Sequence, residues 1–367
     1  MALRVHLGTR KGLFDFEVGD DGSTTTPEVR GFLGAPVTML LSNPEDGNLY
    51  AALDHGHFGV KLHRSDDGGR EWHECAVPEY PSADDTDEKE SAPALNEIWS
   101  LESGGPEHPD RLWCGTIPGG LFLSTDRGDT WQLIDSLWNR EERSQWFGGG
   151  KDHPGIHSIC VDPRNGDHLC VGLSCGGVWR TRDAGQTWEV ASKGMRAEYM
   201  PPERQFDSVI QDPHRMVQCR DAPDNFWVQH HNGVFRSTDG CDSWQEIESP
   251  GVSPFGFAVV VDPQDGDRAW FVPGVKDECR VPVDGRIVVT KTSDGGATFD
   301  VLDAGLPNPP AWDIVFRHCL DIDATGRVLV MGSSTGSVWT SVDAGESWSL
   351  LSPHLPQVYC VRIESDR

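Results

Sequence analysis

The sequence predicts an all-β protein, a seven-bladed β-propeller of four-stranded antiparallel blades, and three observations lead to this prediction. First, one eight-residue phrase occurs six times at near-regular spacing along 367 residues. Regularly spaced internal repeats of this kind are typical of propellers. Second, the 41 Gly, 25 Pro and 14 Trp suit many short strands joined by tight turns. Third, the two ends of the chain carry strand-like segments that together complete one further blade. We therefore expect a single domain over residues 1–367.

The recurring phrase predicts a tight turn between two antiparallel strands. Its second copy reads Ser-Thr-Asp-Arg-Gly-Asp-Thr-Trp over residues 124–131. Asp can accept hydrogen bonds from nearby backbone N–H groups, and Gly adopts the positive φ that a Cβ opposes. The final Trp then begins the next strand and can bury a large apolar surface. The third position is aspartate in all six copies, at Asp67, Asp126, Asp183, Asp239, Asp294 and Asp343.

The pattern Ser/Thr-x-Asp-x-Gly-x-Thr/Ser-Trp resembles the Asp-box, or BNR, repeat of β-propellers. Cys241 replaces the Gly in the fourth copy and Phe299 replaces the Trp in the fifth. The resemblance implies that these aspartates form turns rather than a catalytic site. Such repeats occur in sialidases, xyloglucan hydrolases, sorting receptors and a photosystem-assembly factor. The whole chain looks most like soluble bacterial BNR-repeat proteins labelled exo-α-sialidase-like or glycosyl hydrolase, a likeness carried by residues 55–59, 148–152 and 229–233.

Each repeat follows the same order of four strands. A first apolar run, such as residues 37–42, ends in a Pro/Asp/Gly turn, and a short second run follows, as at residues 49–53, 168–172 and 268–272. The third run leads into the eight-residue phrase, and the fourth begins at its Trp. Alternating apolar and polar positions with regular turns predict antiparallel strands.

The chain ends are expected to close the ring. Residues 3–7, 12–18 and 29–33 read as a second, third and fourth strand, and residues 357–363 read as a lone first strand. Joined, they form a seventh blade, which hides sheet edges that open strands would expose. The alternative is six blades with loose termini.

Composition and charge exclude several classes of partner. The formal net charge is −27, which opposes binding to nucleic acids and to anionic membranes, because both require clustered Lys and Arg. We find no apolar segment typical of a signal peptide or long enough to span a bilayer. The ten Cys are scattered without a CxxC pair, as expected for reduced thiols. A cytoplasmic location is therefore expected.

Loop lengths predict which end of the propeller carries a site. Successive strands of a blade run in opposite directions. The turns between second and third strands and the connections between blades therefore lie on the same face of the propeller. The long insertions all belong to that face, at residues 78–95, 136–155, 192–205, 273–285 and 303–312. The innermost strands are expected to begin there at Thr38, Glu97, His157, Asp207, Phe257 and Asp313. A rigid scaffold commonly carries its site on such loops, so we expect a polar pocket for a small molecule or a glycan.

The first functional hypothesis is a hydrolase acting on a small polar or glycan-like substrate. Most glycosidases use two carboxyl groups, and Glu97 and Asp207 are the candidates for the catalytic acid and base. The substrate-binding candidates are Arg10, Trp146, Lys151, His153, Arg204, Asp277, Arg280 and Asp313. True sialidase activity is disfavoured, because an early Arg-Ile-Pro segment is missing and Tyr199 with Glu203 poorly matches the expected Tyr/Glu pair.

Two further hypotheses use the same face. Histidines of the type that binds Zn²⁺ would give a metal-dependent hydrolase or lyase, with a carboxylate completing an open site. These candidate ligands are His55, His57, His157, His230 and His231. The third hypothesis is a noncatalytic binding or assembly scaffold that uses this face to hold a protein partner.

Overall fold

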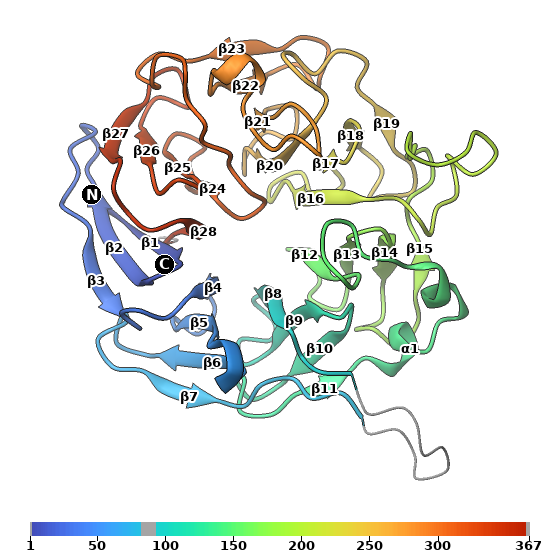
Figure 1. Cartoon of the computed structure of the whole chain (residues 1–367). Helices are drawn as coiled ribbons and strands as arrows, with labels where there is room; N and C mark the ends of the chain where they lie inside the picture. The colour runs from blue at the N-terminus through green and yellow to red at the C-terminus, as the bar shows by residue number, and fades with distance from the viewer. Residues whose placement is uncertain (1, 82–92, 365–367) are drawn as a thin grey trace.

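Seven four-stranded antiparallel sheets form a closed ring. The computed structural model describes residues 2–81 and 93–364. Figure 1 shows the sheets arranged radially, with one strand of each blade innermost. These inner strands, β4, β8, β12, β16, β20, β24 and β28, contact their neighbours around the ring. The seven-bladed prediction is confirmed, and the six-bladed alternative is wrong.

We number the blades around the ring from the closing blade, which both chain ends share. That closing blade contains β28 (Val358–Ile363), β1 (Leu3–Thr9), β2 (Gly12–Val18) and β3 (Glu28–Gly31). The next contains β4 (Val37–Ser42), β5 (Leu49–Asp54), β6 (Val60–Ser65) and β7 (His73–Cys75). It is followed by β8 (Glu97–Ser103), β9 (Leu112–Ile117), β10 (Leu121–Ser124) and β11 (Gln132–Leu133). The fourth contains β12 (Ile156–Val161), β13 (Leu169–Leu173), β14 (Gly177–Thr181) and β15 (Glu189–Val190).

Three more blades complete the ring. The fifth contains β16 (Pro213–Gln218), β17 (Phe226–His230), β18 (Val234–Ser237) and β19 (Gln245–Glu246). The sixth contains β20 (Gly256–Val261), β21 (Ala269–Pro273), β22 (Val289–Thr292) and β23 (Asp300–Leu302). The seventh contains β24 (Leu320–Ile322), β25 (Leu329–Gly332), β26 (Val338–Ser341) and β27 (Ser349–Ser352). Short helices lie in loops: α1 (Asp135–Trp138), η1 (Gly56–Phe58), η2 (Glu141–Gln145) and η3 (Val283–Gly285).

The closing blade joins the two ends of the chain by backbone pairing. Strand β28 pairs antiparallel with β1, with Leu7 opposite Val361, and β1 pairs in turn with β2. In Figure 1 the N-terminal strand, in blue, lies beside the C-terminal strand, in red. The inner edge of this blade is therefore supplied by the last strand of the chain.

The eight-residue turns repeat one hydrogen-bond pattern in all six copies. In the second copy, the Asp126 Oδ1 accepts from Ser124 Oγ at 2.8 Å and from the Thr130 N–H at 2.9 Å. Two consecutive residues of each turn have positive φ, as at Arg127 (61°) and Gly128 (88°). The turn aspartates therefore satisfy backbone donors, as their spacing predicts.

Large aromatic side chains fill the space between and within the blades. The indoles of Trp113, Trp179, Trp227, Trp270 and Trp339 are almost completely buried. Two turn tryptophans also bond to the preceding blade: Trp131 donates to the Ala76 carbonyl at 3.0 Å, and Trp244 donates to the Ala191 carbonyl at 2.7 Å. These two indoles join their own blades to the preceding ones.

Two predicted strand starts are wrong. Asp207 lies in the loop before β16, which begins at Pro213, and Asp313 precedes β24, which begins at Leu320. Of the predicted insertion at residues 78–95, the part at 82–92 lies outside the described residues. Among the helices of the described chain, none is long and apolar enough to cross a membrane.

Candidate functional site

A pocket of about 280 Å³ opens where the starts of inner strands meet the long loops. We call it the Glu97 pocket. Its lining comes from seven parts of the chain: Thr38, Asp54, Glu97, Trp99, Gly149, Gly150, Lys151, Arg280, Phe316, Arg317, His318, Gln357 and Tyr359. Blade topology thus brings residues from both ends of the sequence to one site.

An ion pair and an aromatic ring form one wall of the Glu97 pocket. Glu97 is the first residue of β8, and its Oε2 accepts a hydrogen bond of 2.8 Å from Lys151 Nζ. The same ammonium lies 5.9 Å from the centre of the Trp99 ring. Only Ile98 separates Glu97 from Trp99 on β8, and both side chains line the pocket. Lys151 arrives from the loop between β11 and β12.

Asp54 and Tyr359 add a second carboxylate and a phenol to the pocket lining, whereas the predicted binding residue Arg10 is not part of that lining. The pKa of Tyr359 is raised, mainly because the phenol is partly buried. The carboxylates of Glu97 and Asp54 also raise it, and the Arg10 guanidinium opposes this effect without cancelling it. The Arg10 backbone N–H donates to the Gln357 carbonyl at 2.9 Å, which fixes the β1–β2 turn beside β28. Asp54 ends β5, and its Oδ1 accepts the Gly56 N–H at 2.9 Å. The pocket therefore combines two carboxylates with cationic and aromatic groups.

Two arginines complete the cationic side of the Glu97 pocket. Arg280 pairs with Asp277 at 2.6 Å, and its guanidinium lies 5.4 Å from the centre of the Phe257 ring. Arg317 lies 4.8 Å from the Trp99 ring centre, and among the described residues its buried Nε has no hydrogen-bond partner. Burial lowers the pKa of Arg317 to about 10, so the side chain stays charged at neutral pH.

The structure separates the remaining predicted binding residues from the Glu97 pocket. Asp207 pairs with Arg204 at 2.8 Å in the loop before β16. Trp146 is 7% exposed and packs edge-on against Trp179, so it belongs to the core. Asp313 accepts hydrogen bonds from Ser333 Oγ, at 2.8 Å, and from Thr335 Oγ1, which hold a turn. His153 is exposed in the loop that carries Lys151.

The five histidines predicted as metal ligands do not gather in one place. His55 directly precedes the exposed η1 turn, and His57 lies within it. His157 and His230 are fully buried. The His157 Nδ1 lies 2.9 Å from Ser158 Oγ, and the His230 Nε2 accepts the Asp212 N–H at 3.0 Å. Burial lowers the pKa of His230 to about 3.

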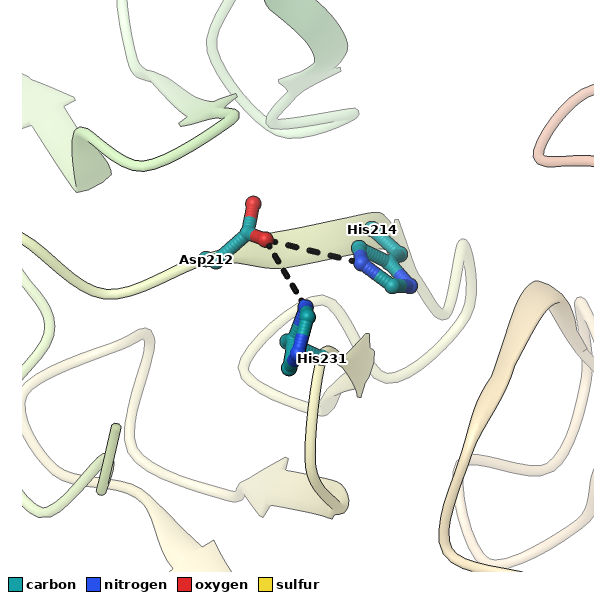
Figure 2. Close-up of side chains that lie close together, drawn as sticks. All are labelled: Asp212, His214 and His231. Carbon is teal, nitrogen blue, oxygen red and sulfur yellow. Dashed lines mark ion pairs between the residues drawn. The ribbon is translucent and has the colours of Figure 1, made fainter. Parts of the chain in front are cut away.

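A different group, which we call the Asp212 cluster, does bring metal-binding side chains together. Asp212 directly precedes β16, His214 lies on β16, and His231 directly follows β17. Their ligand atoms all lie within 4.8 Å of one another. Figure 2 shows one Asp212 oxygen facing both imidazoles, 3.5 Å from His214 Nε2 and 3.3 Å from His231 Nδ1. Of the predicted histidines, His231 belongs to this cluster.

Electrostatics within the Asp212 cluster favour an ionised carboxylate. Burial alone would raise the pKa of Asp212, but His214 and His231 outweigh it and hold the pKa well below its usual range. Burial lowers the pKa of His214 despite the opposing effect of Asp212. For the half-buried His231, burial is outweighed by Asp212 and the pKa is raised.

The sequence contained a usable signal for this cluster. Asp212 directly precedes β16 and His214 is its second residue, so a carboxylate and an imidazole lie two positions apart at the start of an inner strand. Because the inner strand was expected to begin at Asp207, Asp212 and His214 were missed. His231 was therefore grouped with the other four candidate histidines instead of with Asp212 and His214.

The fold and the pocket define a seven-bladed β-propeller with a polar, aromatic-lined pocket at its loop-rich face. No family model matches the chain. It is 24% identical over 270 residues to an oligoxyloglucan-reducing end-specific xyloglucanase of Emericella nidulans, covering 66% of this chain and 31% of that protein. It is 27% identical over 280 residues to a xyloglucanase of a Paenibacillus species, covering 66% of this chain and 25% of that protein.

Solved structures share the architecture. A GH74 xyloglucanase from Xanthomonas campestris superposes with a TM-score of 0.65 at 17% identity, covering 95% of this chain and 52% of that chain. The present chain spans less than a third of the curated relatives, at 31% and 25% of their lengths. These comparisons relate the fold to that of xyloglucanases.

Proposed function

We propose that this propeller hydrolyses a glycan-like substrate in the Glu97 pocket. The observation that carries the proposal is the presence of two carboxylates, Glu97 and Asp54, in the lining of one pocket with Trp99 and Tyr359. Glycoside hydrolysis generally requires two carboxyl groups on either side of the scissile bond. Aromatic rings supply the apolar surface on which a sugar can rest.

In this proposal Asp54 replaces Asp207 as the partner of Glu97. Asp207 is paired with Arg204 in the loop before β16, whereas Asp54 lines the pocket. One of the two carboxyl groups would protonate the leaving oxygen, and the other would activate water or attack the sugar. Lys151 and Arg280 would orient the substrate through its oxygen atoms.

The size and charge of the pocket narrow the proposed substrate. A volume of about 280 Å³ is close to the lower limit of roughly 300 Å³ for ligand pockets, so a chain end or a short unit is favoured. Arg317 lines the pocket with a buried Nε that has no partner among the described residues. The Arg317 guanidinium would donate to a hydroxyl or carboxylate oxygen of the sugar.

Similarity to known proteins supports the class of substrate. The two curated relatives are named as xyloglucanases, at 24% and 27% identity. We therefore propose a panel that contains neutral xyloglucan oligosaccharides as well as oligosaccharides with acidic sugars.

The decisive experiment measures turnover of this panel by the wild type and three variants. Glu97→Gln and Asp54→Asn are expected to lower kcat by about 10²–10⁴-fold, the usual contribution of a positioned acid or base. Asn at position 54 keeps an oxygen for the Gly56 N–H, so the turn is preserved. Asp207→Asn is the matched control and should retain activity.

Two results would contradict the proposal. If no member of the panel is cleaved, the hydrolase assignment is wrong, and saturable binding without turnover would instead indicate the noncatalytic binding module. If Asp207→Asn loses as much activity as Glu97→Gln, the Glu97 pocket is not the site of the reaction.

A further inference from the structure

We infer that Asp212, His214 and His231 form a binding site for a divalent transition-metal ion of the Zn²⁺ class. The inference goes beyond the proposed hydrolase function and does not depend on it. Two imidazoles and one carboxylate are ligands that such ions prefer. Their ligand atoms lie within 4.8 Å of one another. Three protein ligands leave one position for water or another ligand, as in open zinc sites.

The distances between ligand atoms fit a shared ion better than direct hydrogen bonds. Asp212 Oδ2 lies 3.5 Å from His214 Nε2 and 3.3 Å from His231 Nδ1. Charge-assisted hydrogen bonds between nitrogen and oxygen are usually about 2.7–2.9 Å long. Two ligands of a tetrahedral Zn²⁺ with bonds of about 2.0–2.1 Å lie roughly 3.3–3.4 Å apart. Both contacts match this tetrahedral edge.

The hydrogen bonding of His214 fixes which nitrogen faces the carboxylate. The His214 Nδ1 lies 2.7 Å from the Gly256 carbonyl oxygen. A carbonyl only accepts, so Nδ1 carries a hydrogen, and in the neutral ring Nε2 then presents a lone pair. A cation between Nε2 and Asp212 Oδ2 would be bound by lone pairs from both atoms. A ring N–H donated to a backbone carbonyl is also the usual outer contact of a metal-bound histidine.

The carboxylate is held in place by contacts outside the cluster. Asp212 Oδ1 accepts the Cys175 N–H at 3.1 Å and the Ser174 hydroxyl at 3.3 Å. This leaves Oδ2 directed at the two imidazoles (Figure 2). The His231 N–H donates to the Asp212 carbonyl at 3.0 Å, which ties the two ligands together by their backbones. The donor set is therefore arranged before any ion arrives, which reduces the ordering cost of binding.

The site is reachable and adjoins the Glu97 pocket. The His231 side chain is 28% exposed, whereas Asp212 is 3% exposed. Gly149 lines the Glu97 pocket, and a Cβ at this position would lie 3.1 Å from Asp212 Oδ2. The backbone of the loop at residues 148–151 therefore lies between the Glu97 pocket and the proposed metal site.

The test uses the full chain without a His tag, stripped with a chelator and titrated with Zn²⁺ by calorimetry, with metal content measured after dialysis. We expect one tightly held Zn²⁺ per chain in the wild type. Asp212→Asn and His231→Gln should weaken binding at least about tenfold, because each removes a ligand or its charge. His57→Gln changes an exposed histidine outside the cluster and should bind as the wild type does.

Each outcome decides the inference. Absence of stoichiometric binding to the wild type overturns it, and so does unchanged affinity in both ligand variants. If a ligand variant fails to fold, the visible spectrum of the Co²⁺-loaded wild type serves as the test instead. Intense bands typical of four-coordinate Co²⁺ support the site. Weak bands typical of a six-coordinate, hydrated Co²⁺ ion overturn the inference. Loss of metal with retained glycan turnover would leave the hydrolase proposal intact.

Discussion

Individual buried histidines give this propeller a pH response. His6 on β1 is 2% exposed, and its Nδ1 has no hydrogen-bond partner among the described residues. Burial, together with smaller effects of the neighbouring Arg4 and Arg30, lowers its pKa to about 3. In the unfolded chain the same ring would titrate near ~6.5. The folded protein therefore keeps His6 neutral where the unfolded chain would protonate it.

Stability should consequently fall as the solution becomes acidic. Between about pH 6.5 and the folded pKa of about 3, the unfolded state binds one more proton at His6, so the free energy of unfolding decreases by about 1.4 kcal/mol per pH unit from this residue. Urea unfolding of His6→Gln at several pH values should show a slope shallower by up to that amount. His57→Gln, an exposed control, should keep the wild-type slope; equal slopes in all three proteins would contradict the assignment.

At the scale of the element, the loop between β11 and β12 joins the two sites. Gly149 leaves no room for a side chain, because a Cβ would lie 2.7 Å from Cys175 Sγ and 2.9 Å from Ser174 Oγ. Ser174 in turn donates to Asp212. A displaced loop would therefore disturb both the Glu97 pocket and the metal ligands.

Gly149→Ala should lower the free energy of unfolding by about 1–3 kcal/mol, as overpacking of buried positions does. It should also weaken Zn²⁺ binding and glycan turnover together. Gly119→Ala is the control, since its added Cβ would meet atoms at an ordinary 3.6 Å. Thermal unfolding and Zn²⁺ calorimetry measure both effects. If Gly149→Ala behaves like Gly119→Ala, the loop does not couple the two sites.

The same loops mark the limit of prediction from the sequence. Strands β2 and β4 match their predicted bounds because regular turns frame them on both sides. The start of β16 was misplaced because the loop after β15 contains its own tight turns, with Asp207 N–H bonded to the Arg204 carbonyl. That error moved Asp212 and His214 off the predicted face. Glu97, Lys151 and Arg280 were predicted as site residues and do line one pocket, whereas Asp54 was not predicted as a site residue.

For the whole molecule, periodicity predicts the ring but not the depth of each side chain. The sequence repeats one turn six times and divides one further blade between the chain ends. A closed ring is the arrangement that gives every inner strand a partner in its own blade. Burial then depends on contacts between residues far apart in sequence, which a repeat pattern does not contain. Trp146 illustrates this, because packing against Trp179 removes it from the proposed ligand surface.

Ring closure by the C-terminal strand should determine the stability of the whole propeller. Strand β28 pairs with β1 and also contacts β4 and β24. It buries Val358, Cys360, Val361 and Ile363, and each large apolar side chain contributes roughly 1.5–3 kcal/mol. The sum is comparable to the roughly 5–15 kcal/mol that stabilises a typical domain.

Deletion of residues 358–367 should therefore abolish cooperative unfolding and give an aggregation-prone chain, since β1 and the blades on either side would be left with exposed edges. Deletion of residues 365–367, which removes none of β28, is the matched control and should melt like the wild type. Circular dichroism during heating and size-exclusion chromatography measure both variants. A truncated chain that stays monomeric and melts at the wild-type temperature would show that six blades hold together without the closing strand. In that case the pairing of the two termini would contribute little to the stability of the ring.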